Sequence, residues 1–445
     1  MVLEIASAIK LPRNDAINLE KTKMKLLPKL VLALLLIFLL AACAELPFNL
    51  PQPASATPTI VAVVLPTATP VESIEPTETQ PQILRIWLPP EFDPNAETAA
   101  AEILRTRLDT FQKRRPDLTL DIRIKAAEGP AGLLDALITT KKAAPATLPD
   151  LVALPRPELE SAAQQGILHP IDGYSELLDD PDWFPYARPL ARIQNSTYGL
   201  PFSADLFGLA YRPNAEIEDA PEFPTVESLL AQQSQILFVA DSPQAQLSFC
   251  LYTLSGVPLR DEQGQPSLDL EALTNLFSFY ASESISPKSI ELESNEALWE
   301  TFNVQPNTAA TVWTSEYFGE LPADAEIVPI PVPNGGSCSL ATAWSWALAG
   351  ASPDLEPAAA ELAEYLSDSG FLAAWTSALG SLPPRPTALD ESETALQALS
   401  LAAQPVPSND IAEHLGESFR LGTMSVLRDQ VDPAVAAQEA LTGIQ

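Results

Sequence analysis

Residue types that carry catalysis are scarce in this sequence of 445 residues. It contains two histidines, His169 and His414, and three cysteines, too few for the His/Cys clusters that hold a metal ion. The GxSxG, HExxH and GK[ST] patterns, which mark nucleophile elbows, zinc proteases and phosphate-binding loops, do not occur. The sequence therefore predicts no catalytic residue, no metal site and no cofactor.

Carboxylates are the most abundant polar groups. Asp and Glu total 58 against 25 Lys and Arg, a formal net charge of −33, which repels nucleic acid and other polyanions. A pair such as Asp205 and Glu316 could serve glycoside hydrolysis, in which two carboxyl groups flank the scissile bond. That chemistry requires one of them to be buried with a raised pKa, so a secreted glycoside hydrolase is one alternative.

Alternating strands and helices must position these side chains. Apolar runs that end at Pro, and period-two alternation such as Leu118, Leu120 and Ile122, predict strands. Strands are expected at 83–88, 117–125, 150–154, 207–211, 236–240, 309–313, 327–330 and 341–349. Helices are expected within 96–115, 130–142, 157–165, 244–254, 270–281, 357–366, 370–379, 391–403, 409–420 and 433–441. This alternation implies βαβ units, a parallel sheet and an α/β fold.

The first 42 residues have the order of a secretory signal. Lysines precede an apolar run from Leu30 to Leu40, and small residues then reach Cys43. This run is shorter than the roughly 20 residues that span a bilayer. The stretch "LAAC" at 40–43 resembles the lipobox of bacterial lipoprotein precursors, which implies cleavage before Cys43 and acylation of its sulfur. Residues 43–82 are rich in Pro and Thr and predict a disordered, extended spacer.

Removal of the signal and the spacer leaves about 360 residues, more than one core usually supports, so two lobes are expected. The other two cysteines, Cys250 and Cys338, could pair as a disulfide, which persists outside the cell. They could equally remain buried thiols in their apolar surroundings. The sequence leaves both alternatives open.

Four stretches share the pattern of one known family. They are "LRIWLPPE" with "FQKRRPDLTLDI", then "LPDLVALPRPELESAAQQGILHPID", then "YGLPFSADLFGLAYRPN", and last "AWSWALAG" with "AAAELAEYLSDSGFLAAWTSALGSLPPRP". In this order and spacing, over nearly all of residues 83–390, they resemble the extracellular solute-binding proteins of ABC importers, specifically the sugar-binding family that includes maltose-binding protein.

The resemblance implies a two-lobed, periplasmic-binding-protein-like α/β fold with a hinge and a ligand in the cleft between the lobes. By analogy, lobe one comprises 83–201 with 330–380, and lobe two comprises 202–329 with 381–445. The stretch "GGSCSLATAWSWALAG" lacks the family's usual glycine pair directly before its aromatic residue, and residues 305–318 are only loosely similar. These departures leave the identity of the ligand open.

Ligands of parallel α/β sheets bind outside the carboxyl ends of the strands, and sugars favour flat aromatic faces beside hydrogen-bonding side chains. Candidate ligand-binding residues at predicted strand ends or at the lobe crossover are Trp87, Glu91, Phe202, Asp205, Trp313, Glu316 and Trp344. Core packing is the alternative for Trp87 and Trp344, and a solvated carboxylate is the alternative for Asp205 and Glu316. Arg385 is a further candidate. Four other tryptophans are assigned to packing: Trp183, Trp299, Trp346 and Trp375.

The function that the resemblance implies is that of a monomeric, lipid-anchored, extracytoplasmic receptor. It would capture a solute, a sugar or oligosaccharide, and present it to the permease subunits of an ABC importer. This role needs no covalent chemistry, so the protein is not expected to be an enzyme. A surface sensor or an adhesion protein on the same fold is the second alternative, because a fold does not dictate a function.

Overall fold

The computed structural model describes residues 81–213, 223–320, 322, 324–333, 335–350 and 352–444. The expected signal peptide, Cys43 and the expected spacer up to residue 80 lie outside the described residues. The described residues belong to one unit, Thr77–Gln445. In this part of the chain, no helix combines the length and the apolar character needed to cross a membrane.

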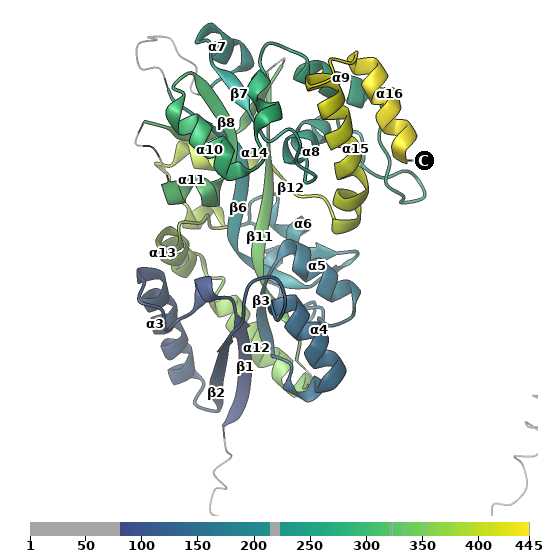
Figure 1. Cartoon of the computed structure of the whole chain (residues 1–445). Helices are drawn as coiled ribbons and strands as arrows, with labels where there is room; N and C mark the ends of the chain where they lie inside the picture. The colour runs from purple at the N-terminus through teal and green to yellow at the C-terminus, as the bar shows by residue number, and fades with distance from the viewer. Residues whose placement is uncertain are drawn as a thin grey trace, which may run out of the picture. The chain divides into compact units, whose positions relative to one another are not determined.

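A mixed sheet with the main strand order β2-β1-β3-β11-β6-β8-β7 forms the centre of this unit (Figure 1). The strands are β1 (Gln82–Leu88), β2 (Leu118–Ile124), β3 (Leu151–Pro155), β4 (Arg192–Ile193), β5 (Ser196–Thr197), β6 (Gly199–Tyr211), β7 (Gln235–Leu237), β8 (Thr308–Trp313), β9 (Glu326–Val328), β10 (Ile330–Val332), β11 (Gly336–Leu348) and β12 (Ala403–Pro405). β1 pairs in parallel with β2 and β3, and β7 pairs in parallel with β8.

Helices pack on the sheet, and local sequence explains where several begin and end. The helices are α3 (Ala99–Arg114), α4 (Leu133–Ala143), α5 (Arg156–Gln164), α6 (Ala187–Ala191), α7 (Val226–Ala231), α8 (Gln246–Thr253), α9 (Leu270–Tyr280), α10 (Asn295–Val304), α11 (Thr314–Glu320), α12 (Glu356–Tyr365), α13 (Ser369–Leu379), α14 (Thr394–Ala402), α15 (Asn409–Leu427) and α16 (Pro433–Ile444). The Thr98 hydroxyl caps α3, which ends two residues before Pro116. Gly380, with φ of 68°, ends α13.

Two long antiparallel strands connect the two halves of the sheet. β6 and β11 contain 13 residues each, and they pair from Gly199 opposite Ala347 to Phe207 opposite Leu340. The prediction of a parallel sheet is therefore wrong at the centre, because these strands pass between the halves in opposite directions. The strands expected at 207–211 and 341–349 begin earlier than the local pattern indicates.

In the part of the chain that the structure describes, three apolar cores cover the two faces of the sheet. Neighbouring residues of a strand point to opposite faces. The core that we call the shared core contains Ile86 of β1 and Ala210 of β6, and thus runs along one face of both halves. On the other face, Trp87 belongs to a first core and Leu209 to a separate second core. The apolar core is thus continuous along one face of the sheet, whereas on the other face it is divided into two separate cores.

The second core contains a disulfide between Cys250 of α8 and Cys338 of β11, with their Cα atoms 5.7 Å apart. Of the two alternatives that the sequence leaves open, the structure contains the disulfide. Ile330 and Leu340 also pack in the second core, although the expected boundaries assign 330–380 to lobe one. Those boundaries stay a prediction.

Candidate functional site

Strands from both halves end near the same segment of β6. The last residue of β3, Pro155, pairs with Trp344, which pairs in turn with Ser203 of β6. The last residue of β8, Trp313, pairs with Phe207 of β6. These two positions on β6 are four residues apart. The carboxyl ends of β3 and β8 therefore lie close to each other, at the middle of the crossing strands. Ligands of α/β sheets bind outside such carboxyl ends.

Asp205 occupies the middle of this segment, and both of its carboxylate oxygens accept hydrogen bonds from the start of α11. Oδ1 accepts from the Thr314 hydroxyl at 2.8 Å and from the Ser315 N–H at 2.9 Å, and Oδ2 accepts from the Ser315 hydroxyl at 2.7 Å. Burial raises the pKa of Asp205, and these hydrogen bonds oppose that rise. The side chain therefore fastens α11 to the crossing strand.

Glu316, on the first turn of α11, is also held by its neighbours. Its Oε1 accepts from Asn295 Nδ2 at 2.8 Å, and its Oε2 accepts from the Trp313 N–H at 3.3 Å. Burial raises its pKa, and the charge of Asp205 adds to that rise. Glu316 borders an open groove of about 420 Å³ between α10 and α11. The groove residues are Asn295, Glu296, Trp299, Glu300, Ser315, Glu316 and Gly319.

A second, narrower pocket lies beyond the carboxyl end of β7. Asn295 borders both cavities, so they are neighbours on the same half. Phe207, Phe238 and Arg420 contribute to the wall of the pocket, and Arg420 forms ion pairs with Asp241 and Glu417. The half-buried Trp313 ring lies 5.3 Å from the Phe207 ring, next to this wall.

The other half contributes Glu91 and Trp344. Glu91 is exposed in the 3₁₀ helix Pro90–Phe92. The neighbouring Phe92 is buried, and its ring meets the half-buried Trp344 ring edge-on at 5.2 Å. Glu91 is thus exposed and Trp344 is partly exposed. Phe92, which follows Glu91 in the chain, contacts the Trp344 ring.

Two candidates lie inside cores. Phe202 has 0% of its surface exposed and stacks on Trp346 at 4.2 Å and on Trp375 at 5.4 Å. Trp87 is 3% exposed in the first core. Their rings are covered by other side chains, so the structure does not place them beside Trp313 or Glu316 at the surface. Three of the four tryptophans assigned to packing are at most 5% exposed and border neither cavity described above: Trp183, Trp346 and Trp375. Trp299 is also 5% exposed, but it borders the groove.

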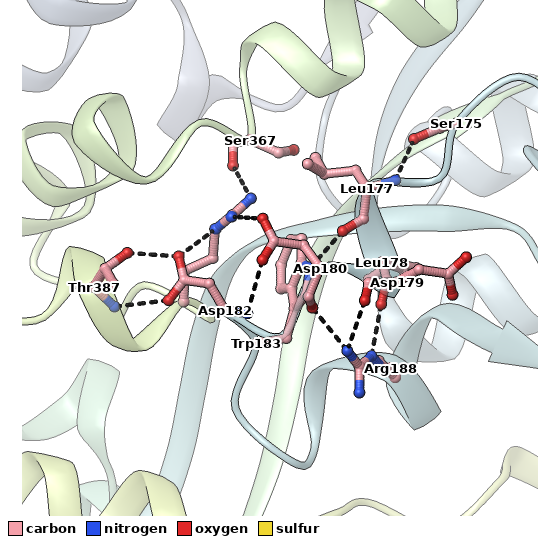
Figure 2. Close-up of polar contacts among 11 residues, drawn as sticks. Ser175, Leu177, Leu178, Asp179, Asp180, Asp182, Trp183, Arg188, Ser367 and Thr387 are labelled. Carbon is pink, nitrogen blue, oxygen red and sulfur yellow. Dashed lines mark hydrogen bonds and ion pairs between the residues drawn. The ribbon is translucent and has the colours of Figure 1, made fainter.

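Arg385 has a structural role that the sequence does not indicate. It is 5% exposed, donates to Asp182 Oδ2 at 3.0 Å and to Asp180 Oδ2 at 2.8 Å, and lies over the Trp183 ring. Figure 2 shows this network, in which Thr387 also points at Asp182. The ion pairs of the buried Arg385 side chain hold the segment after α13 against the loop before α6.

Sequence reasoning missed Asn295, Ser315 and Arg420. Helix α10, which begins at Asn295, follows no strand with a clear pattern, and α11 is only seven residues long. Arg420 falls at the end of an expected helix, and only packing brings it next to the carboxyl end of β7. Among the described residues, no three His, Cys, Asp or Glu side chains are grouped to hold a metal ion.

Comparison with known proteins identifies the family of this chain and related folds. A model of the family described as bacterial extracellular solute-binding protein matches residues 106–402. The structure is similar to the sugar-binding protein MalE from Xanthomonas citri, with TM-score 0.65, 21% identity, and 82% of this chain and 96% of that chain covered. No curated protein sequence matches the chain.

Two further solved structures have the same fold. The cyclic α-maltosyl-1,6-maltose binding protein from Arthrobacter globiformis has TM-score 0.65 and 15% identity, with 82% of this chain and 98% of that chain covered. The maltose-binding periplasmic protein MalE from Listeria monocytogenes, in complex with maltose, has TM-score 0.64 and 14% identity, with coverages of 82% and 97%. These similarities confirm the predicted two-lobed α/β fold.

Proposed function

The chain belongs to the family of bacterial extracellular solute-binding proteins, and we propose that its solute is a saccharide, captured between the lobes and passed to the permease of an ABC importer. The observation that carries this proposal is the groove beside Ser315 and Glu316, just beyond the carboxyl end of β8. Ligand sites combine apolar walls with a few fixed polar groups. The Trp299 ring and the Asn295 and Glu316 side chains in the groove are such a combination, and the Trp313 ring lies beside Phe207 of the neighbouring pocket.

Hydrogen bonding would select the solute without covalent chemistry. The Glu316 carboxylate and the Asn295 amide hold each other in place, so they would meet sugar hydroxyls with little further ordering. A solute without matching hydroxyls would leave partly buried polar groups unpaired, which lowers its affinity. Glu91 and Trp344 would contribute from the other lobe as the lobes close. The similar structures named above, which bind maltose or related glucans by their descriptions, support a saccharide.

The N-terminal segment would keep this receptor at the membrane. Acylation of Cys43 in the lipobox-like stretch at 40–43 would anchor the chain, and the Pro- and Thr-rich residues 43–82 would act as a spacer. We propose a monomeric, extracytoplasmic receptor that is tethered by this lipid. Globomycin treatment of cells, which blocks lipoprotein signal cleavage, should make the precursor accumulate; normal processing in its presence would refute the anchor.

Glycoside hydrolysis is the enzymatic alternative. The pKa of both Asp205 and Glu316 is raised, which an acid catalyst requires. However, both oxygens of Asp205 accept hydrogen bonds from Thr314 and Ser315, so neither is directed only at a substrate. Incubation with maltotriose and other oligosaccharides, followed by chromatography, should show no cleavage.

Calorimetric titration and thermal shift with a saccharide panel test the proposal. Maltose, maltotriose, maltotetraose and unrelated oligosaccharides are the probes, because a ligand that binds only the native state raises its stability. We expect Trp313→Ala to abolish binding with little change in the melting temperature, whereas Trp375→Ala, in the shared core, should mainly lower that temperature. Binding of peptides or polyamines but of no saccharide would refute the proposed solute class.

A further inference from the structure

The net charge of this protein is unevenly distributed along the chain. Residues 81–145 contain ten Lys and Arg and nine Asp and Glu, whereas residues 146–445 contain nine Lys and Arg and 42 Asp and Glu. The first of these segments forms β1, α3, β2 and α4. An anionic partner would therefore meet less repulsion at this segment than on the rest of the protein.

Helix α3 ends at the amino end of β1. Lys113 and Arg114 are exposed in its last turn. The chain then enters β2 at Leu118, which pairs with Gln82, the first residue of β1. Arg114 borders a groove that also contains carboxylates of α12, so its charge is partly offset. Lys113 is not among the residues of that groove.

Helix α4 ends at the same end of the sheet. Lys141 and Lys142 are exposed in its last turn. The Arg85 guanidinium of β1 donates to the carbonyl of Ala146, just after α4, at 3.5 Å. In Figure 1, β1 and β2 lie between α3 and α4. We call four residues the basic end: Lys113, Arg114, Lys141 and Lys142.

Ion pairs leave the charge of the basic end largely available. Among the described residues, no Asp or Glu forms an ion pair with any of its four side chains. The nearby carboxylates of Asp117 and Glu361 pair with Arg115 instead. Lys141 donates to two backbone carbonyls, which carry no net charge. The basic end can therefore attract an external anion.

The helix dipole alone does not account for these cations. The carboxyl end of every α-helix attracts positive side chains. Among the described α-helices with at least eight residues, however, only α3 and α4 have Lys or Arg in the last turn. Positive charge is thus gathered at one end of one half of the sheet, not at helix ends in general.

On the basis of the proposed lipid tether, we propose that the basic end docks on the anionic phospholipid headgroups of the membrane. The proposed spacer, residues 43–82, leads directly into β1, so the tether would keep the basic end near these headgroups at a high effective concentration. Each Lys or Arg near an anionic membrane surface favours binding by about 5-fold. Repulsion of the acidic remainder adds to the effect, and the receptor is held with the amino end of β1 towards the membrane.

Hydrogen–deuterium exchange on vesicle-bound protein tests the docking. The chain from residue 43 would be coupled through the Cys43 thiol to a maleimide lipid, which replaces the acyl anchor. Cys250 and Cys338 are paired and buried, so they do not react. The vesicles consist of phosphatidylcholine, either alone or with about 30% phosphatidylglycerol, which supplies the negative surface potential. Mass spectrometry follows peptides 108–118 and 139–147 at the basic end, and peptide 283–291 beside the second core as an internal control.

We expect peptides 108–118 and 139–147 to exchange more slowly on the phosphatidylglycerol vesicles than on the neutral vesicles, with no difference for peptide 283–291. The protection should vanish at about 0.5 M NaCl, because salt screens exposed charges. Lys113→Gln/Lys142→Gln should lower the ratio of docked to free protein by about 25-fold, since two cations are lost. Exchange on the neutral vesicles verifies that this variant is folded.

Lys288→Gln/Arg428→Gln is the matched control. It changes the net charge by the same amount, at exposed positions away from the basic end, and it should keep the protection. Equal exchange of the wild type on both kinds of vesicle would overturn the proposal, as would protection that survives in Lys113→Gln/Lys142→Gln. Protection by soluble polyphosphate but not by phosphatidylglycerol would overturn the assignment to lipid.

Titration with maltotriose in solution separates the docking from the proposed function. Lys113→Gln/Lys142→Gln should bind as the wild type does, because the basic end lies at the opposite end of β1 from Glu91. If no saccharide binds but the protection still depends on phosphatidylglycerol, the saccharide assignment fails and the docking stands. If saccharides bind and the protection is absent, the docking fails and the receptor role stands. The maleimide lipid makes the result independent of natural acylation, which the globomycin experiment tests.

Discussion

Asp205 on the crossing strand β6 and Ser315 on α11 are joined by two hydrogen bonds, from the Ser315 N–H at 2.9 Å and from its hydroxyl at 2.7 Å. Ser315 directly precedes Glu316, which borders the groove. The pair therefore sets the position of Glu316 relative to the strand that connects the lobes. The sequence suggests that the Asp205 carboxylate binds the ligand. In the structure it binds Thr314 and Ser315 and so positions Glu316.

Asp205→Asn should weaken saccharide binding more than it weakens the fold. The oxygen of the new amide can keep the bonds from the Thr314 hydroxyl and the Ser315 N–H, but its NH2 group cannot accept from the Ser315 hydroxyl, which must turn to accept from it. We expect this rearrangement to lower the free energy of unfolding by about 1–2 kcal/mol. Removal of a buried charge offsets part of that cost. Urea denaturation and calorimetric titration measure the two effects, with the exposed Asp354→Asn as control. Unchanged binding would show that Glu316 does not depend on Asp205.

The pH dependence of stability should contain a contribution from Glu158. Burial, with a further contribution from the charge of Glu128, raises the pKa of Glu158 to about 7. Its pKa in the folded state therefore exceeds its value in the unfolded chain, so the native state binds the extra proton. Stability falls as the pH rises from about 4.5 to 7, and it stays lower above that range.

Glu158→Gln removes this titration. Because the side chain is only partly buried, we expect the variant to exceed the wild type by about 1 kcal/mol at pH 8 and to match it near pH 4.5. Urea denaturation at several pH values measures the difference, and the exposed Glu262→Gln provides the control. A difference that does not change with pH would contradict the assigned titration.

Removal of the disulfide should destabilise the second core. The 88-residue separation of Cys250 and Cys338 places the expected cost of Cys250→Ala/Cys338→Ala near 2–4 kcal/mol, since the bond restricts the unfolded chain. Thermal unfolding with and without a reductant measures it. With reductant, the melting temperature of the wild type should approach that of the double variant. Equal melting temperatures of the two proteins without reductant would show that the bond contributes nothing to stability.

Gly422→Ala should disrupt the packing of α15 on α9. A Cβ at this position would collide with the Phe277 ring, so the ring or the helix must move, at a cost of about 1–3 kcal/mol in the free energy of unfolding. Gly443→Ala is the matched control in α16, where a Cβ meets nothing within 4 Å, and it should be neutral or slightly stabilising. Equal melting temperatures of the two variants would contradict the close approach.

Local patterns were sufficient for much of the fold. Period-two alternation identifies β2, and apolar helical faces identify α3 and α9. The same patterns fail for α11, since its start depends on Asp205, a partner distant in the sequence. For α10 a local signal was missed, because the Ser294 hydroxyl accepts the Ala297 N–H and caps the helix. They also place the start of β6 eight residues too late, because pairing with β11 extends it through polar and proline positions.

The sequence by itself determined the α/β class, the likeness to solute-binding proteins and the candidates at strand ends, because these depend on short-range periodicity and motif order. Tertiary structure alone decided which candidates are accessible: Phe202 is buried and stacks on Trp346 and on Trp375, whereas Trp313 stays half-buried beside Phe207, which borders a pocket. The aromatic partners of Phe202 and the hydrogen-bond partners of Asp205 are more than 100 positions away in the chain. No local pattern encodes which of them will meet.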